Sequence, residues 1–544
     1  MPKFKLHPLS ISFDISESTL LRVQTVLAKH MFFLLLIIFT IISIYYFQSF
    51  YTNKLGLSYN DARSHLDIGR RVVEGLKPGL AQLGSVWLPL PHILMIPTIW
   101  NDFMWHSGLA GSLQSMISFV VTGLVIYSFL KILGVGMFGR LLGVFVFVAN
   151  LNILYLQSVA MTELLLISTM TIGVYELVLW AHDDKIVNLV KSAFWVMLST
   201  LVRYDGWFLL IISTCIVAFL TWKKRGYKTS EGLSILFVTL AGLGVVGWFV
   251  WNQLIFKDAL YFALGPFSAR VQQQQMEKAG ALMTKGDLLL STQVYLYALF
   301  FNSGTFTAFL GLFGAIAFWL SKNIKTSIKI ASLSLLTPLL FNIIALFFGH
   351  SVLFVQGISG NTWFNVRYGI MMMPSIAIFI GYLAHKVKSL RWVFLGLLFF
   401  VTFFAFNSSD AVTIDDARVG SSQKNVSEVS GWLSTHAKDE KGFILISAAS
   451  HDAIIFSSGL PMKKFIHEGT GAYWESATIA PDRWARWIVM RTHDDNDLSW
   501  KFVSRAPGFV KYEKTAAYPF ADIYQLKDEF LGDLNTEPVF GKQK

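Results

Sequence analysis

The sequence predicts a polytopic α-helical membrane protein that ends in a small α/β domain, and three observations lead to this prediction. Of the 544 residues, 54% are hydrophobic and 15% are charged, and the mean hydropathy is +0.53. Soluble domains average about 45–50% apolar and about 25% charged residues. Runs of about 20 apolar residues recur up to residue 406, which is the length that crosses a bilayer. From residue 407 onward the composition becomes that of a soluble domain.

Eleven apolar runs are predicted to span the membrane. They cover residues 31–50, 108–130, 141–157, 163–181, 188–202, 206–222, 232–255, 304–320, 329–349, 368–385 and 391–406. A further stretch, "VWLPLPHILMIPTIW" at 86–100, is apolar but short, and it holds three prolines. Because proline interrupts helices, this stretch is expected to be an interfacial or re-entrant segment.

The positions of the basic residues predict the orientation of the chain. With the N-terminus in the cytoplasm, the inner segments hold 18 of the 29 Lys and Arg residues that precede residue 407. Cytoplasmic loops are enriched in Lys and Arg, so this bias supports that orientation, and an odd number of spans places the C-terminus outside. We therefore expect a multi-pass protein of a plasma (inner) membrane.

Three parts follow from this topology. They are a cytoplasmic N-terminal segment (1–30), a membrane domain (31–406) with a large first outer loop (51–107), and an extracytoplasmic soluble domain (407–544).

The tail from residue 407 predicts a small α/β fold. "SEVSGWLSTHA" is typical of an amphipathic helix and "GFILISAA" of a short strand. "RWARWIVMR" predicts a second strand or the edge of a helix, and "ADIYQLK" predicts a last strand.

Net charge separates the two parts of the chain. The formal charge is +11, yet the tail carries 16 basic and 19 acidic residues, whereas residues 1–406 carry 29 and 15. The positive excess therefore lies in the membrane part, which indicates topology and anionic ligands rather than nucleic acid. A single cysteine excludes an intrachain disulfide.

Chemistry-bearing residues follow the first apolar run, in "YNDARSHLDIGRRV". Asp61 and His65 lie four residues apart, on one face of a predicted helix. That face can present a carboxylate as general base or metal ligand, with His65 beside it. Alternatively, Ser58 caps the helix and Asp61 completes a capping box; the two interpretations can coexist. A divalent metal at Asp61, His65 and Asp67 is compatible with the sequence, which does not require one.

Other polar residues fall at the outer ends of later spans. Glu163 lies in "AMTELLL", where the helix dipole also favours an acid. Arg203 lies in "LVRYDGW", where it can pair with Asp205. Arg367 and Tyr368 lie in "WFNVRYGIMMMPS", at a helix start that disfavours a cation. The presence of arginine at this position therefore needs another explanation. Its apolar stem can lie along the span while the charged group reaches water, or the charged group can bind an anionic ligand.

The topology places acids, a histidine and arginines on the same outer face. They are Asp61, His65, Arg70, Arg71, Glu163, Arg203 and Arg367. Arginine suits bidentate capture of phosphate, and lipid phosphates lie at this depth. The pattern therefore predicts a site where a phosphate-bearing lipid meets a base that takes a proton from an acceptor hydroxyl.

Several motifs resemble the GT-C class of polytopic glycosyltransferases. Within it the chain is similar to the family 39-like enzymes, which include protein O-mannosyltransferases and lipid A aminoarabinose transferases. The matching stretches are "YNDARSHLDIGRRV", "GSVWLPLPH", "AMTELLL", "LVRYDGW" and "NVRYGIMMMPS". The resemblance covers most of residues 30–406. Residues 60–61 are Asn-Asp, whereas many relatives have paired acids, which weakens the case for a metal-bridging diacid.

The resemblance implies a sugar transfer in the cell envelope. The donor would be a sugar on a polyprenyl phosphate, the acceptor a glycan, lipid or protein, and Asp61 the general base. Glu163 would support the acceptor or an interaction of the second outer loop, and Arg203 and Arg367 would hold the lipid phosphate. We expect His65 to join Asp61 and Glu163 in catalysis. Substrate or phosphate contacts are expected from Arg70, Arg71, Arg203, Arg367 and Tyr368.

Two other functions remain open on the sequence. A polytopic secondary transporter would have a similar number of spans, but transporters keep their ionisable residues near the membrane midplane. A lipid-linked-glycan ligase or polymerase would share the outer site and differ in its acceptor.

Overall fold

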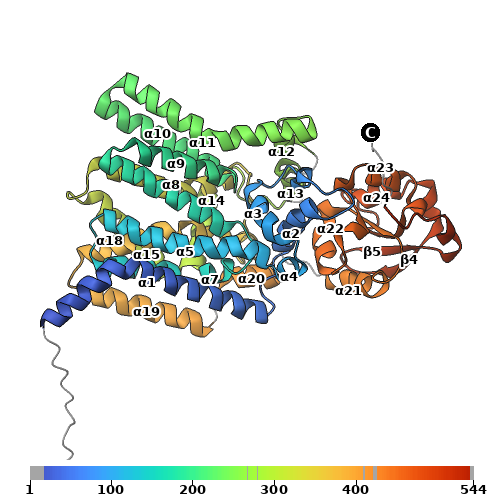
Figure 1. Cartoon of the computed structure of the whole chain (residues 1–544), viewed down its shortest axis with the longest axis horizontal. Helices are drawn as coiled ribbons and strands as arrows, with labels where there is room; N and C mark the ends of the chain where they lie inside the picture. Colours follow the sequence, from blue (N-terminus) through green and yellow to red (C-terminus); the bar gives the residue numbers. More distant parts are fainter. Residues whose placement is uncertain (1–16, 266–267, 279, 409–410, 421–425, 539–544) are drawn as a thin grey trace, which may run out of the picture.

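The computed structural model describes residues 17–265, 268–278, 280–408, 411–420 and 426–538. Figure 1 shows a long bundle of helices joined at one end to a smaller domain that contains a sheet. Three short helices lie at the junction, namely α2 (Asn60–Val73), α3 (Leu90–Ile99) and α4 (Asp102–His106).

Eight helical segments in the described part of the chain are long and apolar enough to cross a membrane. They are Lys29–Thr52 of α1 (Glu17–Thr52), α5 (Leu109–Ile132), α8 (Glu163–Asp183), α10 (Asp205–Arg225), α11 (Tyr227–Phe256), Thr326–Phe347, Val366–Lys386 and Arg391–Val419. A ninth candidate is the pair α14 (Leu288–Ser303) and α15 (Thr305–Leu320), which is bent by 107°.

Each of the eleven apolar runs is helical, which confirms the polytopic fold. Two of them are short: α6 (Met137–Val148) has 12 residues and α9 (Ile186–Thr200) has 15. Both are shorter than the roughly 20 residues that a helix needs to cross a bilayer, so neither is among the candidate spans. The prolines of residues 86–100 give only the ten-residue α3, as expected of an interfacial segment.

The remaining helices of this part of the chain either form parts of these spans or lie between them. They are α7 (Leu151–Leu156), α12 (Tyr261–Leu264), α13 (Ala269–Lys278), α16 (Thr326–Ala331), α17 (Thr337–Phe347), the 3₁₀ helix η3 (Val366–Met372), α18 (Met373–Lys386), α19 (Arg391–Ser408) and α20 (Val412–Val419).

The segment made of η3 and α18 lies at the centre of the bundle. Of the residues in its most apolar stretch, 94% are buried. The corresponding value is 6% for the last candidate span, whose helix α19 lies along the outer edge in Figure 1. A Cβ on Gly143 of α6 would lie 2.7 Å from the carbonyl oxygen of Ala377 in α18. Small residues let these two helices pack backbone to backbone, which fixes α18 and the η3 turn before it.

The C-terminal domain is built on a five-stranded sheet in the order β2-β1-β3-β5-β4. Its elements are α21 (Ser427–His436), β1 (Phe443–Ile446), α22 (Ala448–Ser457), β2 (Phe465–Ile466), α23 (Ala472–Ile479), β3 (Ala485–Met490), α24 (Leu498–Val503), β4 (Tyr512–Ala517) and β5 (Asp522–Leu526). Strands β2, β1 and β3 are parallel, and β5 and β4 continue antiparallel. The helix and strands predicted in the tail are therefore present, and "RWARWIVMR" contains a strand.

The two faces of the sheet pack into different cores. Ile444 and Ile446 of β1 belong to the same apolar core as the helical bundle, whereas Phe443 and Leu445 pack into a second core on the far face. This alternation follows from the two-residue period of a strand. The sheet is thus joined to the bundle through one apolar face.

Helix α22 docks the sheet domain onto α2. Arg71 Nη1 lies 2.7 Å from Asp452 Oδ1, and Arg63 Nη1 donates to Ser457 Oγ at 3.3 Å. The ring of Phe456 packs edge-on against Trp105 of α4. Helix α2, which carries Asp61, is therefore held between the bundle and the sheet domain.

Candidate functional site

Arg367 lies at the centre of the polar site. Its side chain is 3% exposed and contacts carboxylates from three helices. Nη2 lies 2.7 Å from Asp61 Oδ2, Nε lies 3.0 Å from Glu163 Oε1, and Nη1 lies 3.5 Å from Asp416 Oδ2. These acids belong to α2, α8 and α20, so one cation joins segments that are distant in the sequence. We call Arg367 and these three acids the Arg367 cluster.

A glycine brings the turn that carries Arg367 into place. A Cβ on Gly369 would clash with the backbone of Ala298 and Leu299 in α14. Glycine lacks that atom, so η3 can lie directly against α14. Pro374 follows at the first turn of α18, where its fixed φ is favourable.

Gly369→Ala is therefore expected to lower the free energy of unfolding by about 1–3 kcal/mol, because backbone rather than a flexible side chain must move. Thermal unfolding in detergent measures the change. The matched control is Gly396→Ala in α19, whose Cβ would meet nothing within 4 Å and should leave stability unchanged or slightly raised. Equal unfolding temperatures for wild type and Gly369→Ala would contradict the close packing of η3 on α14.

Arg203 is the second cation of the site. Nη1 lies 3.3 Å from Glu163 Oε1, and Nε lies 3.4 Å from Asp205 Oδ2, so the pair expected within "LVRYDGW" is present. Burial opposes the charge of Arg203, but Tyr368, Asp205 and Glu163 together raise its pKa above the ordinary value. Glu163 is fully buried, and its Oε1 is shared by both arginines. Glu163 therefore couples the two cations.

Aromatic rings enclose the two guanidinium groups. The Arg367 guanidinium carbon lies 4.8 Å from the ring centre of Tyr59 and 5.5 Å from that of Tyr368. The Arg203 guanidinium lies 4.6 Å from the ring centre of Tyr368. Cation–π contacts of this kind stabilise a desolvated cation. Tyr368 thus lies between the two arginines.

Tyr59 and Asp416 are site residues that the sequence analysis did not identify. The Tyr59 hydroxyl lies 2.8 Å from the Thr413 carbonyl oxygen and 3.1 Å from Asp416 Oδ2. Burial raises the pKa of Tyr59 well above its usual value, so the phenol stays neutral. Thr413 donates in turn to Asn152 Oδ1 from both its backbone N–H and its hydroxyl. These bonds fix α20 against the bundle.

Asp61 is the accessible acid of the Arg367 cluster. Its side chain is 40% exposed, whereas those of Glu163 and Asp416 are fully buried. The capping-box interpretation is wrong: α2 begins at Asn60, its N-cap is Tyr59, and no side chain caps it. Asp61 points instead to Arg367. Its carboxylate is the one that a ligand from outside the bundle can reach.

His65 and Asp67 face other partners. His65 Nδ1 lies 2.8 Å from His92 Nε2, and its ring packs 4.2 Å from that of Trp87. Asp67 Oδ1 accepts a hydrogen bond from Trp105 Nε1 at 3.0 Å. The structure does not bring Asp61, His65 and Asp67 together. Within the described ranges, no group of three His, Cys, Asp or Glu side chains is arranged to hold a metal ion.

Arg70 and Arg71 are tied to neighbouring segments. Arg70 pairs with Glu74, lies 2.6 Å from Asp102 Oδ1, and donates to the carbonyl oxygens of Ile99 and Trp100. Arg71 pairs with Asp452 of α22, as described above. Both side chains are largely buried, so each arginine fixes α2 against a neighbouring element.

The environment of His65 predicts a pH dependence of stability. Burial, and then the charges of Arg203 and Arg367, lower its pKa from 6.5 to about 3. Protonation therefore favours the unfolded chain, whose histidine pKa is near 6.5. The stabilising contribution is complete above that pH and is lost as the pH falls toward 3. At pH 5.5 the loss is about 1.4 kcal/mol.

Thermal unfolding of wild type and His65→Gln between pH 7.5 and 5.5 measures this contribution. We expect the unfolding temperature of wild type to fall more steeply on acidification than that of His65→Gln. The difference between the two unfolding temperatures should therefore become smaller at pH 5.5. Parallel curves would contradict a neutral, buried His65.

The comparisons with known proteins identify the fold. No protein-family model and no curated protein sequence matches the chain. Among solved structures, ArnT from Cupriavidus metallidurans bound to undecaprenyl phosphate matches with a TM-score of 0.54 at 10% identity, over 90% of this chain and 98% of ArnT. Its apo form matches with a TM-score of 0.52 at 11% identity, over 86% and 94% of the two chains.

An archaeal oligosaccharyltransferase, AglB from Archaeoglobus fulgidus in complex with an inhibitory peptide and a dolichol-phosphate, matches with a TM-score of 0.47 at 10% identity, over 85% of this chain and 69% of that chain. The match to ArnT extends over both the helical bundle and the sheet domain, since it covers nearly the whole of both chains. The chain has the GT-C fold of ArnT.

Proposed function

We propose that the protein is an integral membrane glycosyltransferase. It moves a sugar from a polyprenyl-phosphate donor to an acceptor hydroxyl on the extracytoplasmic face of a plasma (inner) membrane. The GT-C fold supports this class of reaction, and so does the undecaprenyl phosphate in the structure of ArnT.

One observation carries the proposal: a single accessible carboxylate is held by a buried ion network. Asp61 is 40% exposed, while the Arg367 that orients it is 3% exposed. An oriented carboxylate beside open space is the arrangement that a general base requires. Neighbouring cations are what a phosphate leaving group requires.

The chemical step assigns Asp61 one role. Its carboxylate accepts the proton of the acceptor hydroxyl as that oxygen attacks the anomeric carbon of the sugar. The bond between the anomeric carbon and the phosphate oxygen breaks, and polyprenyl phosphate leaves with the bonding electrons. One glycosidic bond forms and one sugar–phosphate bond is lost.

Arg203 is the better placed of the two arginines to meet the donor phosphate. Its side chain is 20% exposed, compared with 3% for Arg367. Tyr368 packs against both guanidinium groups. We assign Arg203 and Tyr368 to the phosphate, and Arg367 to holding Asp61 and Glu163 while it adds positive charge.

The other predicted site residues act through α2 in this proposal. Arg70 and Arg71 are already paired with carboxylates, so they position the helix. His65 is neutral and bonded to His92, so it fixes α2, the helix that carries Asp61, against α3.

A transporter is less well supported. Glu163 is the first residue of α8, and Arg367 is the second residue of the segment Val366–Lys386. Ionisable groups of transporters lie near the middle of spans or at breaks within them. The Arg367 cluster lies at span ends instead.

The test is the level of lipid-linked sugar in cells that lack the native gene. We would complement them at equal protein level with wild type, with Asp61→Asn, or with Asp528→Asn, which changes an exposed acid in the sheet domain. Accumulation of a polyprenyl-phosphate sugar with Asp61→Asn alone is the expected result, and its mass would identify the sugar. Identical lipid profiles in all three strains would refute the proposal.

A further inference from the structure

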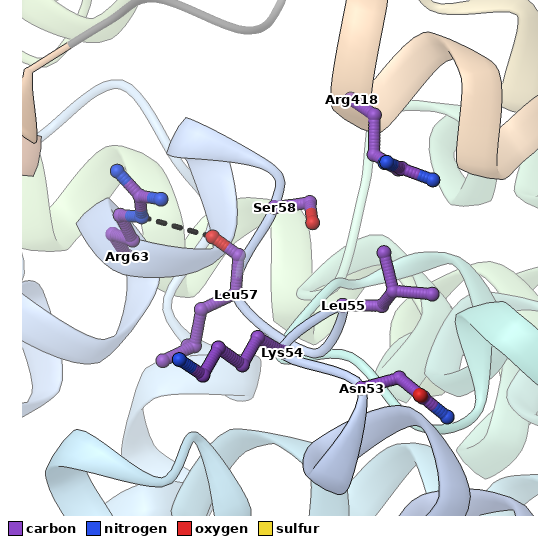
Figure 2. Close-up of a pocket in the computed structure, with 7 residues that line it drawn as sticks. All are labelled: Asn53, Lys54, Leu55, Leu57, Ser58, Arg63 and Arg418. Atoms are coloured by element: carbon purple, nitrogen blue, oxygen red, sulfur yellow. Dashed lines mark hydrogen bonds between the residues drawn. The ribbon is translucent and has the colours of Figure 1, made fainter.

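A polar cavity is lined mainly by the loop that joins α1 to α2. Its volume is about 530 Å³. Figure 2 shows Lys54, Leu55, Leu57 and Ser58 of the loop between α1 and α2 around it, with Arg63 of α2 and Arg418 of α20 at its sides. The cavity therefore joins three separate parts of the chain.

The lining of this cavity is strongly cationic. Lys54, Arg63 and Arg418 contribute to it, and none of the seven residues that line it is acidic. Within the described ranges, the Lys54 ammonium and the Arg418 guanidinium have no hydrogen-bond or ion-pair partner. This differs from Arg203 and Arg367, which carboxylates surround.

Arg63 is a partly buried cation whose bonds go to neutral groups. Nε donates to the Leu57 carbonyl oxygen at 2.9 Å, and Nη1 lies 3.3 Å from Ser457 Oγ and 3.5 Å from Asn60 Oδ1. Burial lowers the pKa of Arg63, because no acid offsets the loss of water. An anion beside this partly desolvated cation would offset the water that it has lost.

Lys54 has a left-handed backbone conformation that is unfavourable for lysine. Helix α1 ends in a Schellman motif, in which Leu55 N donates to Phe50 O at 2.9 Å and Lys54 N donates to Tyr51 O at 3.0 Å. Lys54 occupies the left-handed position of this motif, with φ = 58°, where glycine is preferred. A lysine there adds a charge to the cavity at a conformational cost.

The depth of the cavity identifies the kind of anion. Asn53 and Lys54 follow directly on the span Lys29–Thr52, and Arg418 lies in α20, the short helix that follows the apolar helix α19 in the sequence. Ends of spans lie at the level of lipid headgroups. Leu55 and Leu57 add an apolar side to the cationic lining.

We infer that this cavity, lined by Lys54, Arg63 and Arg418, is a binding site for the phosphate group of an anionic membrane phospholipid. It is distinct from the donor site. The residues 58–63 and 416–418 run from the cavity to the Arg367 cluster, so a bound headgroup would also fix the segments that carry Asp61 and Asp416.

The test uses the full-length protein in lipid nanodiscs. We would compare phosphatidylglycerol with phosphatidylcholine, and native mass spectrometry would count the lipids retained after release. Wild type should retain phosphatidylglycerol in preference. The double variant Lys54→Gly and Arg418→Gln should bind it at least about tenfold more weakly, since two charge-assisted contacts are lost.

Two features keep this test independent of folding and of the proposed reaction. Lys54→Gly places the preferred residue in the left-handed position, so the variant should be no less stable than wild type. Asp61→Asn should retain phosphatidylglycerol like wild type, whatever its effect on sugar transfer. The matched control is Lys257→Gln, since Lys257 also has a left-handed conformation (φ = 63°) at the end of span α11.

Inorganic phosphate distinguishes the two sources of a phosphate group. If inorganic phosphate displaces phosphatidylglycerol, and the double variant loses both, a phosphate ion is sufficient and the cavity is still an anion site. If the double variant weakens retention of phosphatidylglycerol and inorganic phosphate does not displace it, the lipid is the ligand. Equal retention of both lipids by wild type and the double variant would overturn the inference.

Discussion

Asp61→Asn is expected to slow sugar transfer by about 10²–10⁴-fold, the usual contribution of a positioned general base. Asparagine has nearly the same shape as aspartate, and its amide oxygen can still accept the hydrogen bond that Arg367 Nη2 makes at 2.7 Å. It cannot take a proton at neutral pH. The fold should therefore remain while the reaction fails. The measurement is the initial rate of transfer by purified protein supplied with the lipid-linked sugar found in cells.

Two controls separate a loss of the base from a loss of structure. The unfolding temperature of Asp61→Asn should lie close to that of wild type, because the side chain is 40% exposed. Asp61→Glu keeps a carboxylate and should recover part of the rate. A full rate in Asp61→Asn would exclude this residue as the base and would leave it as a partner of Arg367.

Arg367→Gln is expected to lower the free energy of unfolding by about 3–5 kcal/mol. The substitution removes the cation that faces Asp61, Glu163 and Asp416, and the last two acids are fully buried. Buried carboxylates without a counter-charge are strongly unfavourable. Arg203 reaches Glu163 but not Asp416, so it offsets only part of the loss. Thermal or denaturant unfolding in detergent measures the effect.

Arg367→Lys and Arg270→Gln complete this experiment. Lysine keeps the charge but lacks the planar fork that contacts three acids at once, so its stability should be intermediate. Arg270 is exposed on α13, and Arg270→Gln should change stability by no more than about 0.5 kcal/mol. If Arg367→Gln were as stable as wild type, the buried acids would have to be protonated in the folded protein.

The architecture was predictable where hydropathy alone determines it. Apolar runs gave the helices of the bundle, and strong β-formers gave β1, β3 and β5. Strand β4, "YEKTAA", was missed because an edge strand with charged residues lacks an alternating apolar pattern. Helix α14 and its bend against α15 were missed, because only residues 304–320 were predicted to span and Asn302, Ser303 and Gly304 interrupt the apolar pattern before them.

The site was predictable only in part. Asp61, Glu163, Arg203 and Arg367 stood out because the predicted topology places all four on the same outer face, next to apolar spans. Asp416 lies in "TIDDARV", a polar stretch like many others, and only tertiary packing brings it to Arg367. His65 shares a helix face with Asp61, but one turn rises by about 5.4 Å, which is enough for His65 to meet His92 instead.

The position of Asp416 in α20, after the apolar helix α19, has a consequence for biogenesis. A ribosome makes Arg367 and the whole bundle before it makes α20, so the nascent protein holds a buried arginine that lacks one of its acids. The Arg367 cluster is completed only when α20 has docked through Thr413 and Asn152. The order of synthesis thus delays assembly of the cluster until nearly all helices of the bundle have been made. A chain that stalls or is cut within α19 would lack Asp416 and leave Arg367 with two of its three acids.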